Sequence, residues 1–345
     1  MTAAGRPEAV TALPPPHDLV IIGAGPAGLS AFIQARRLAM HPIVVDPGEP
    51  GGALRAGWRV RNYPGIETCA GLDLARRMAD HAKGLGGFRL LRDRAETIRR
   101  GETWSLCLAS GGILRTRAVI LATGQEPVVP ESLETLRTTG ALLLPGSYEG
   151  EVWRGLRVLI IGGGDVAFDQ GLRLLDAGAR PSILCRSDPR ALPVLREEAR
   201  RRGVPVRTGL SPIGSVGGPP PSVTFQDGED PARTLTLPAE GVLVAAGRRP
   251  HPPGIVDEGG RPARINLRSG SNGGLFFAGD LRRGSRRQAV VAAGDGCMAA
   301  LEAFDYLKGR SGGHHDVGAH GVARHAGSGT DLRPVRAGTA SGTLD

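Results

Sequence analysis

One stretch near the N-terminus, Asp18–Gly28, most constrains how this chain can fold. An apolar run ends there in the pattern G-x-G-x-x-G, and a helix is expected over residues 29–40. A strand, a tight turn and a helix start in this order form a cradle for a dinucleotide pyrophosphate, because glycines let the backbone approach the phosphates and the helix N-terminus favours negative charge. The stretch predicts a nucleotide site that includes Gly23, Gly25, Pro26, Ala27 and Gly28.

An acidic residue at the right distance supports this interpretation. The next expected strand, residues 42–45, ends in Asp46, about 20 residues beyond the motif, where an acid suits a ribose hydroxyl. The alternative is a glycine turn of an ordinary αβ unit, since the chain contains 53 glycines. Asp46 favours the nucleotide site.

The opening pattern returns in the second half of the chain. An apolar run at residues 157–161 is followed by Gly162-Gly163-Gly164-Asp165-Val166-Ala167 and a helix to about Ala177, with alanine at the third glycine position. The strand after it ends at Cys185-Arg186, and an arginine fork can bind a 2′-phosphate bidentately. A second nucleotide site is therefore expected, with NADPH favoured over NADH.

Coarser patterns fill the intervals between these motifs. Helices are expected at 71–85, 192–202 and 288–307, and strands at 89–98, 104–109, 113–116, 119–124, 204–208, 241–245 and 274–280, with a second meander at 222–237. The length of 345 residues suggests two domains. Residues 1–16 and 309–345, rich in small and polar residues, are expected to be disordered.

Composition excludes several classes of protein. The net charge of +9 is typical of proteins that bind nucleic acid, but only Lys83 and Lys308 are lysines, so arginine-rich codon usage in the genome explains the charge. Aromatic residues, which stack on bases, make up only 4%, so no nucleic-acid partner is expected. No apolar stretch approaches the ~20 residues of a membrane span, and the N-terminus lacks a secretory pattern, so a cytoplasmic protein is expected.

Cysteine is sparse. The four cysteines, Cys69, Cys107, Cys185 and Cys297, form no C-x-x-C redox pair and no half of a zinc site, so no metal is expected. The histidines of the C-terminal tail are read as adventitious ligands.

Further motifs join these in a fixed order: Gly51-Gly52, Asn62-Tyr63-Pro64-Gly65, Ala122-Thr123-Gly124, Ala245-Ala246-Gly247-Arg248-Arg249-Pro250, Phe277-Ala278-Gly279-Asp280, Arg287-Gln288-Ala289 and 294–300. The ordered set, over about residues 18–308, resembles the low-molecular-weight thioredoxin reductase type of pyridine nucleotide-disulfide oxidoreductase (class II). The resemblance implies an α/β fold of two dinucleotide-binding domains, each Rossmann-like with three layers (ββα). The FAD domain (17–124 plus 248–308) would contain an inserted NAD(P)H-binding domain (125–247).

The resemblance also implies roles for particular residues. FAD would be bound by the first motif, with Asp46 at the adenosine ribose and Asp280 near the ribityl chain. Arg287, Gln288 and Ala289 would lie beside the isoalloxazine ring. The remaining motif residues would complete the FAD site: Gly51, Gly52, Asn62, Ala122, Thr123, Gly124 and Gly279. NADPH would be bound by Gly162, Gly164, Asp165, Val166, Arg186, Arg190, Ala246 and Gly247. An arginine and a helix N-terminus beside a flavin stabilise its anionic reduced form.

Two departures from this family limit the functional inference. Where its thioredoxin reductases carry C-x-x-C, this chain has the cysteine-free stretch 142–148, and the disulfide position of glutathione-reductase-like relatives is Ala53 and Leu54. Dithiol exchange needs an attacking and a resolving thiol, so thioredoxin reduction is not expected. In the basic sequence that reads the 2′-phosphate, only Arg186 is in register: position 187 is serine and Arg190 is displaced by one. A vestigial nucleotide site is the alternative.

The expected function is therefore FAD-dependent oxidoreduction, with electrons passing from NADPH to a non-disulfide acceptor after rotation of the nicotinamide domain. One alternative is a flavin oxidase or dehydrogenase that acts directly on a small metabolite with oxygen as acceptor. Another is a non-catalytic flavin-binding redox sensor or assembly partner. A homodimer is expected from the resemblance, and no catalytic acid or base is singled out.

Overall fold

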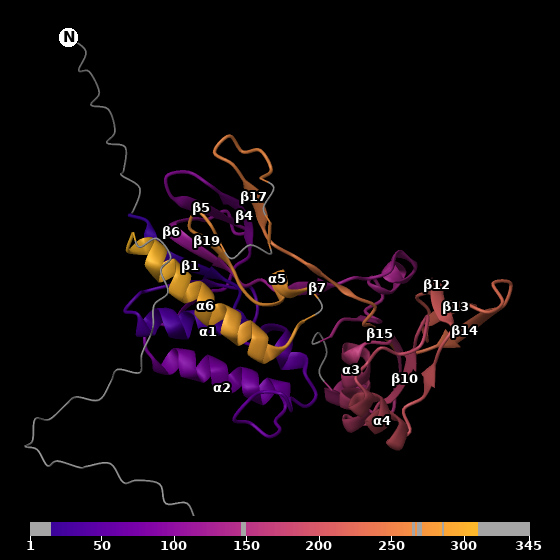
Figure 1. Ribbon diagram of the computed structural model, residues 1–345. Helices are drawn as coiled ribbons and strands as arrows, with labels where there is room; N and C mark the ends of the chain where they lie inside the picture. Colours follow the sequence, from indigo (N-terminus) through magenta and orange to yellow (C-terminus); the bar gives the residue numbers. More distant parts are fainter. Residues whose placement is uncertain (1–14, 146–149, 264–265, 268–270, 285, 310–345) are drawn as a thin grey trace, which may run out of the picture. The chain divides into compact units, whose positions relative to one another are not determined.

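The computed structural model describes residues 15–145, 150–263, 266–267, 271–284 and 286–309 (Figure 1). The predicted disordered leader and tail lie outside the described residues except at their inner ends, as do residues 146–149 of the cysteine-free stretch. Within the described part of the chain, no helix combines the length and apolar character that crossing a membrane requires.

Nine strands form the first sheet. Its main path runs β17-β4-β5-β6-β1-β2-β3, and β19 pairs with both β6 and β18. The strands are β1 (His17–Ile22), β2 (Ile43–Val45), β3 (Arg89–Leu91), β4 (Ala95–Arg99), β5 (Trp104–Leu108), β6 (Ile113–Leu121), β17 (Gly254–Val256), β18 (Ser271–Asn272) and β19 (Leu275–Phe277). The pairs of β1 with β2 and β6, of β2 with β3 and of β6 with β19 are parallel.

Alternation along β1 explains the layers around this sheet. Leu19 and Ile21 pack in one core cluster with residues of three helices, which lie side by side in Figure 1: α1 (Pro26–Arg37), α2 (Gly71–Gly84) and α6 (Ala289–Leu307). Val20 and Ile22 belong to another cluster, which contains residues of the antiparallel β4-β5-β6 meander. Because successive side chains of a strand face opposite sides, one apolar run supplies the middle of three layers.

Two details of this sheet differ from the sequence prediction. The strands expected at 113–116 and 119–124 are one strand, β6, whose first half pairs with β5 and whose second half pairs with β1 and β19. The strand expected at 89–98 is two: β3 extends the parallel sheet beside β2, and β4 joins the meander. Local apolar patterning cannot distinguish these cases, because pairing partners lie far away in sequence.

The second set of elements repeats the three layers. A parallel sheet of order β11-β10-β9-β15-β8 comprises β8 (Leu142–Leu143), β9 (Arg157–Ile161), β10 (Arg180–Leu184), β11 (Val206–Arg207) and β15 (Gly241–Val244). Val158 and Ile160 pack with residues of α3 (Asp165–Asp176) and α4 (Pro193–Arg201). Leu159 and Ile161 pack towards an antiparallel sheet of β12 (Leu210–Val216), β13 (Ser222–Asp227) and β14 (Thr234–Pro238). Strand β12 was not predicted.

Two short strands carry the chain into and out of this second set. β7 (Gln125–Pro127) pairs antiparallel with β16 (Arg248–Pro250), and β17 then returns to the first sheet beside β4. The remaining short helices are η1 (Gly52–Ala56), η2 (Glu131–Leu136), η3 (Gly150–Trp153) and α5 (Asp280–Arg283). The predicted fold class is confirmed: two Rossmann-like ββα units, the second inserted within the first.

Candidate nucleotide-binding site

The two glycine turns are built in the same way. Gly23 has φ +105°, and a Cβ there would lie 2.4 Å from the Ala122 carbonyl oxygen. Gly162 has φ +141°, and its Cβ would lie 2.3 Å from the Ala245 carbonyl oxygen. Only glycine fits either position, because of both the dihedral angle and the close neighbour. Glycine at each turn therefore allows close contact with the end of a neighbouring strand, at Ala122 or at Ala245.

The start of α1 is held close to its turn. Gly25 is the N-cap and Pro26 occupies the first turn, where a missing N–H costs nothing. A Cβ on Gly28 would lie 1.8 Å from the Gly23 carbonyl oxygen, so this glycine lets helix and turn touch. A Cβ on Gly25 would have no atom nearer than Gly52 Cα at 4.0 Å. This arrangement leaves the helix N-terminus accessible to an anion.

Asp46 is fixed by backbone hydrogen bonds at the end of β2. Its Oδ2 accepts the Ala24 N–H at 2.6 Å and its Oδ1 accepts the Gly48 N–H at 2.7 Å. Each carboxylate oxygen has a further lone pair, so both can still accept a hydroxyl hydrogen bond. The carboxylate is thus oriented towards the first glycine turn before any ligand binds.

A cavity of about 1510 Å³ joins the two turns. Most of the predicted site residues line it: Gly23, Gly25, Pro26, Ala27, Asp46, Gly52, Asn62, Ala122, Thr123, Gly124, Asp280, Arg287, Gln288, Ala289, Gly162, Gly164, Asp165, Val166, Arg186, Arg190, Ala246 and Gly247. Three predicted residues are not among the lining residues. Gly28 packs on the first turn, a Cβ on Gly51 would lie 2.5 Å from Ala75 Cβ, and one on Gly279 would lie 2.8 Å from Ala27 Cβ. These glycines allow close packing behind the cavity.

Two buried polar atoms in this lining make no hydrogen bond among the described residues: Thr123 Oγ1 and Arg248 Nε. Buried donors are rarely left unpaired in a folded protein, so both are suited to contact a polar ligand. Among the other lining residues, a Cβ on Gly124, Gly164 or Gly247 would meet no atom within 4 Å. Unpaired donors and open glycine backbone at both turns fit phosphate- and ribose-bearing ligands.

Charged residues gather where α5 begins. Burial raises the pKa of Asp280, while the nearby positive charges of Arg248 and Arg287 act to lower it. Burial also lowers the pKa of Arg248. Behind them, Arg283 pairs through two nitrogens with the buried carboxylate of Asp295, whose Oδ2 also accepts the Gly279 N–H at 3.3 Å. This second pair fixes the backbone that presents Asp280.

The loop after β10 folds onto the second glycine turn. The Arg190 N–H donates to the Gly163 carbonyl at 2.7 Å, and the Leu192 N–H donates to Asp165 Oδ1 at 2.8 Å. The Asp165 carboxylate thus holds this loop in addition to supplying a negative charge in the first turn of α3. The side chains of Arg186 and Arg190 are exposed along the same cavity.

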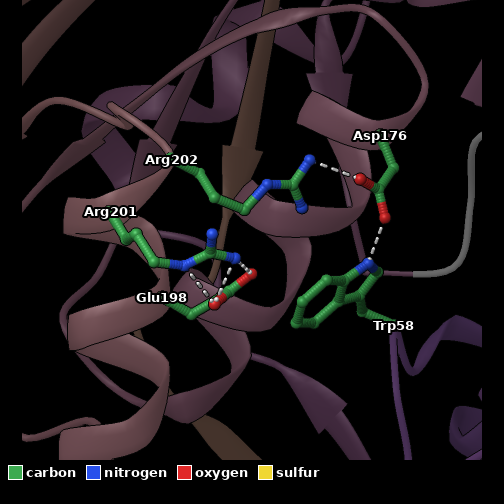
Figure 2. Close-up of polar contacts among 5 residues, drawn as sticks. All are labelled: Trp58, Asp176, Glu198, Arg201 and Arg202. Carbon is green, nitrogen blue, oxygen red and sulfur yellow. Dashed lines mark hydrogen bonds and ion pairs between the residues drawn. The ribbon is translucent and has the colours of Figure 1, made fainter.

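Sequence reasoning missed Trp58, which connects the loop after η1 to α3. Its backbone N–H donates to both carboxylate oxygens of Asp169, at 3.1 and 3.0 Å. Its indole Nε1–H donates to Asp176 at 2.5 Å, and Asp176 also pairs with Arg202 at 2.6 Å (Figure 2). Trp58 is 7% exposed and packs in the core cluster of the second unit. Burial raises the pKa of Asp169 to about 6. The available signal was a tryptophan, a large apolar side chain, in a loop next to Arg59.

The four cysteines belong to different elements of the fold. Cys107 lies in β5, Cys185 follows β10 and Cys297 lies in α6, while Cys69 precedes α2. All four are free thiols, and burial raises the pKa of Cys185 and Cys297, which disfavours the reactive thiolate. No cluster of three potential metal ligands occurs among the described side chains.

Comparison with known proteins places this architecture in a family. The family model described as pyridine nucleotide-disulphide oxidoreductase matches residues 17–296. Thioredoxin reductase of Bacillus subtilis is 30% identical over 311 residues, which cover 85% of this chain and 95% of that protein. Thioredoxin reductase of Listeria innocua is 30% identical over 313 residues, with 85% and 94% covered.

A solved structure shows the same relation in three dimensions. Lactococcus lactis thioredoxin reductase superposes with a TM-score of 0.75 at 27% identity, over 85% of this chain and 99% of that one. Sequence match, fold and paired glycine turns agree. The chain belongs to the pyridine nucleotide-disulphide oxidoreductase family, as a thioredoxin reductase-like FAD-dependent oxidoreductase.

Proposed function

We propose that this protein transfers electrons from NADPH through FAD to an acceptor that is not a disulfide. The observation that carries the proposal is the single cavity that reaches both glycine turns, together with the absence of any C-x-x-C pair from the sequence. Among the residues that line this cavity, the one cysteine is Cys185, and burial raises the pKa of its thiol. A lone, poorly ionised thiol supplies neither the attacking nor the resolving group of dithiol exchange.

For FAD, the first turn and α1 would bind the pyrophosphate, and Asp46 would accept a ribose hydroxyl hydrogen bond. Thr123 Oγ1 and four further lining residues would meet the remainder of the cofactor: Asp280, Arg287, Gln288 and Ala289. Bound FAD would supply the hydride-accepting and electron-donating chemistry. The protein's own part is to bind, orient and surround it with charge.

For the pyridine nucleotide, the second turn and α3 would bind the pyrophosphate. Arg186 and Arg190 lie on one loop that Gly163 and Asp165 hold by hydrogen bonds, and their exposed guanidinium groups could meet a 2′-phosphate. This supports NADPH over NADH, in spite of the serine at position 187.

Two spectroscopic measurements test the proposal in order. A flavin absorbance band near 450 nm after purification with added FAD tests whether the cofactor binds. Anaerobic titration with NADPH should then bleach the band, and NADH should do so more slowly. Arg186→Gln should reduce the NADPH preference. If neither nucleotide bleaches bound flavin, the proposal is wrong, and bleaching by a small metabolite instead would favour the direct oxidase or dehydrogenase reaction.

Acceptors are tested in the same assay. Candidates of the non-disulfide class are ferredoxin, free flavin, quinone and oxygen, each added to NADPH-reduced protein while reoxidation is followed. Rapid reoxidation by one of them, with none by oxidised thioredoxin, is expected. Reoxidation by thioredoxin disulfide would contradict the cysteine argument. Stable reduced flavin with every acceptor would favour the redox sensor or assembly partner.

We also propose the domain division 17–124 plus 248–308 for FAD and 125–247 for NADPH, and a homodimer acting in the cytoplasm. The β7–β16 pair, where the chain crosses twice, supports this division. Sedimentation at micromolar concentration should give twice the mass of one chain. A monomer under those conditions would remove the dimer from the proposal without affecting the cofactor assignment.

A further inference from the structure

We propose that Gln125 is a positioning residue that sets the reduction potential of the bound flavin by holding Arg287. The inference rests on the proposed function, in which FAD occupies the cavity lined by both residues. Gln125 follows Ala122-Thr123-Gly124 directly, but no role was assigned to it from the sequence. Its contacts in the structure suggest one.

The side chain of Gln125 connects two segments that the cofactor site needs. Its Nε2 donates to the Asp280 carbonyl oxygen at 2.8 Å and to the Gly284 carbonyl oxygen at 3.4 Å, at the two ends of α5. Its Oε1 accepts a hydrogen bond from Arg287 Nη1 at 2.9 Å. One amide therefore links α5 to the arginine that precedes α6.

The chemistry of these partners fixes the orientation of the amide. A guanidinium can only donate and a carbonyl oxygen can only accept, so Oε1 must face Arg287 and Nε2 must face Asp280 and Gly284. A flipped amide would place two donors together on one side and acceptors together on the other. Glutamine satisfies both sides, whereas glutamate or methionine cannot.

Neutrality is the second property that glutamine contributes. Arg287 hydrogen-bonds a neutral oxygen, so its positive charge is oriented without being cancelled. The carboxylate near it is Asp280, whose charge Arg248 also shares. With both arginines charged, the group keeps an excess of positive charge beside the cavity, which favours the anionic reduced form of a bound flavin.

The backbone of Gln125 has a separate structural role. Its carbonyl oxygen accepts a hydrogen bond from Arg248 Nη2 at 2.9 Å, and its strand pairs with β16. These bonds do not involve the side chain, so a substitution of the side chain leaves them available. The two roles can therefore be separated by mutation.

The experiment measures the two-electron midpoint potential of bound FAD in the full chain. In Gln125→Met, which has similar length but no amide, Arg287 is released, and we expect the equilibrium to shift about tenfold towards oxidised flavin, or about 30 mV for two electrons. Gln125→Glu adds a negative charge beside Arg287 and should also lower the potential. Gln226→Met is the matched control, because Gln226 lies in β13 and donates to the Pro231 carbonyl.

A double-mutant cycle tests whether Gln125 acts through Arg287. Arg287→Met should lower the potential at least as much as Gln125→Met, and the double variant should equal Arg287→Met. Additive effects, or a potential at or above the wild-type value in both Gln125→Met and Gln125→Glu, would overturn the inference. Failure of the wild-type chain to bind flavin would instead contradict the proposed function, so the two failures are distinguishable.

Discussion

Trp58→Phe should destabilise this protein through one identifiable hydrogen bond. The substitution removes the indole N–H that donates to the Asp176 carboxylate at 2.5 Å and leaves an aromatic ring in the same core cluster. A hydrogen bond to a charged acceptor contributes about 1.5–3 kcal/mol. Asp176 keeps its ion pair with Arg202 at 2.6 Å, so we expect a loss near the lower end, about 1.5–2 kcal/mol.

Trp104→Phe provides the matched comparison. Trp104 is 3% exposed, and its indole N–H donates at 3.1 Å to a neutral acceptor, the Gly273 carbonyl. The expected loss is smaller, about 0.5–1.5 kcal/mol, because the acceptor is uncharged. Comparing two Trp→Phe changes removes most of the contribution of ring size, and leaves the charge of the acceptor as the main difference.

Urea unfolding followed by far-ultraviolet circular dichroism measures both losses, provided that the slopes with denaturant agree. A cycle of Trp58→Phe with Asp176→Asn should show a coupling of about 0.5–3 kcal/mol, since the residues are in direct contact. The reasoning is refuted if Trp58→Phe is no more destabilising than Trp104→Phe and the cycle shows no coupling.

Three further perturbations follow from the same structure. Burial raises the Asp169 pKa from 3.8 to about 6. The protonated carboxyl group therefore makes its full contribution to stability below pH 3.8, and this contribution is lost as the pH rises through about 6. Asp169→Asn should therefore unfold with a higher free energy than wild type at pH 8, by up to about 3 kcal/mol, with the difference vanishing near pH 4; lower stability at pH 8 would contradict this. Gly28→Ala places a Cβ 1.8 Å from a carbonyl oxygen and should abolish folding or flavin binding, whereas Gly164→Ala meets open space and should keep the melting temperature while weakening NADPH binding; equal melting temperatures for the two would refute the steric argument. Arg186→Gln should raise the KM for NADPH and leave that for NADH unchanged, and a parallel rise in both would show that Arg186 does not read the 2′-phosphate.

Much of the fold could be predicted from local sequence. The apolar runs ending in glycine motifs predicted β1 and β9, and the helices α1, α2, α3, α4 and α6 were predicted with ends displaced by a few residues at most. Pairing was harder. The strand β12 was missed because it contains a proline and a glycine, although it pairs with β13 along its length. Strand β6 was divided in two because arginines interrupt its apolar pattern, while its pairing with β5 and with the distant β1 makes it one strand.

The candidate site divides in the same way. Residues within glycine motifs could be found from spacing, and most of them line the cavity. Gly28, Gly51 and Gly279 were grouped with them, but the space around a glycine cannot be read from sequence, and these three allow packing behind the cavity. Trp58 and Gln125 were missed because their hydrogen-bond partners lie far away in the sequence. The separation is 111 to 118 residues for Trp58 and 155 to 162 residues for Gln125.

The sequence by itself determined that two glycine-rich turns exist and that no C-x-x-C pair accompanies them, because both depend on residues a few positions apart. Only the tertiary structure decided that the turns open into one cavity, that Asp165 holds a loop, and that Gln125 connects α5 to Arg287. The physical reason is range: dihedral preference and spacing act within a turn, whereas a hydrogen bond between distant segments exists only once the sheets have formed.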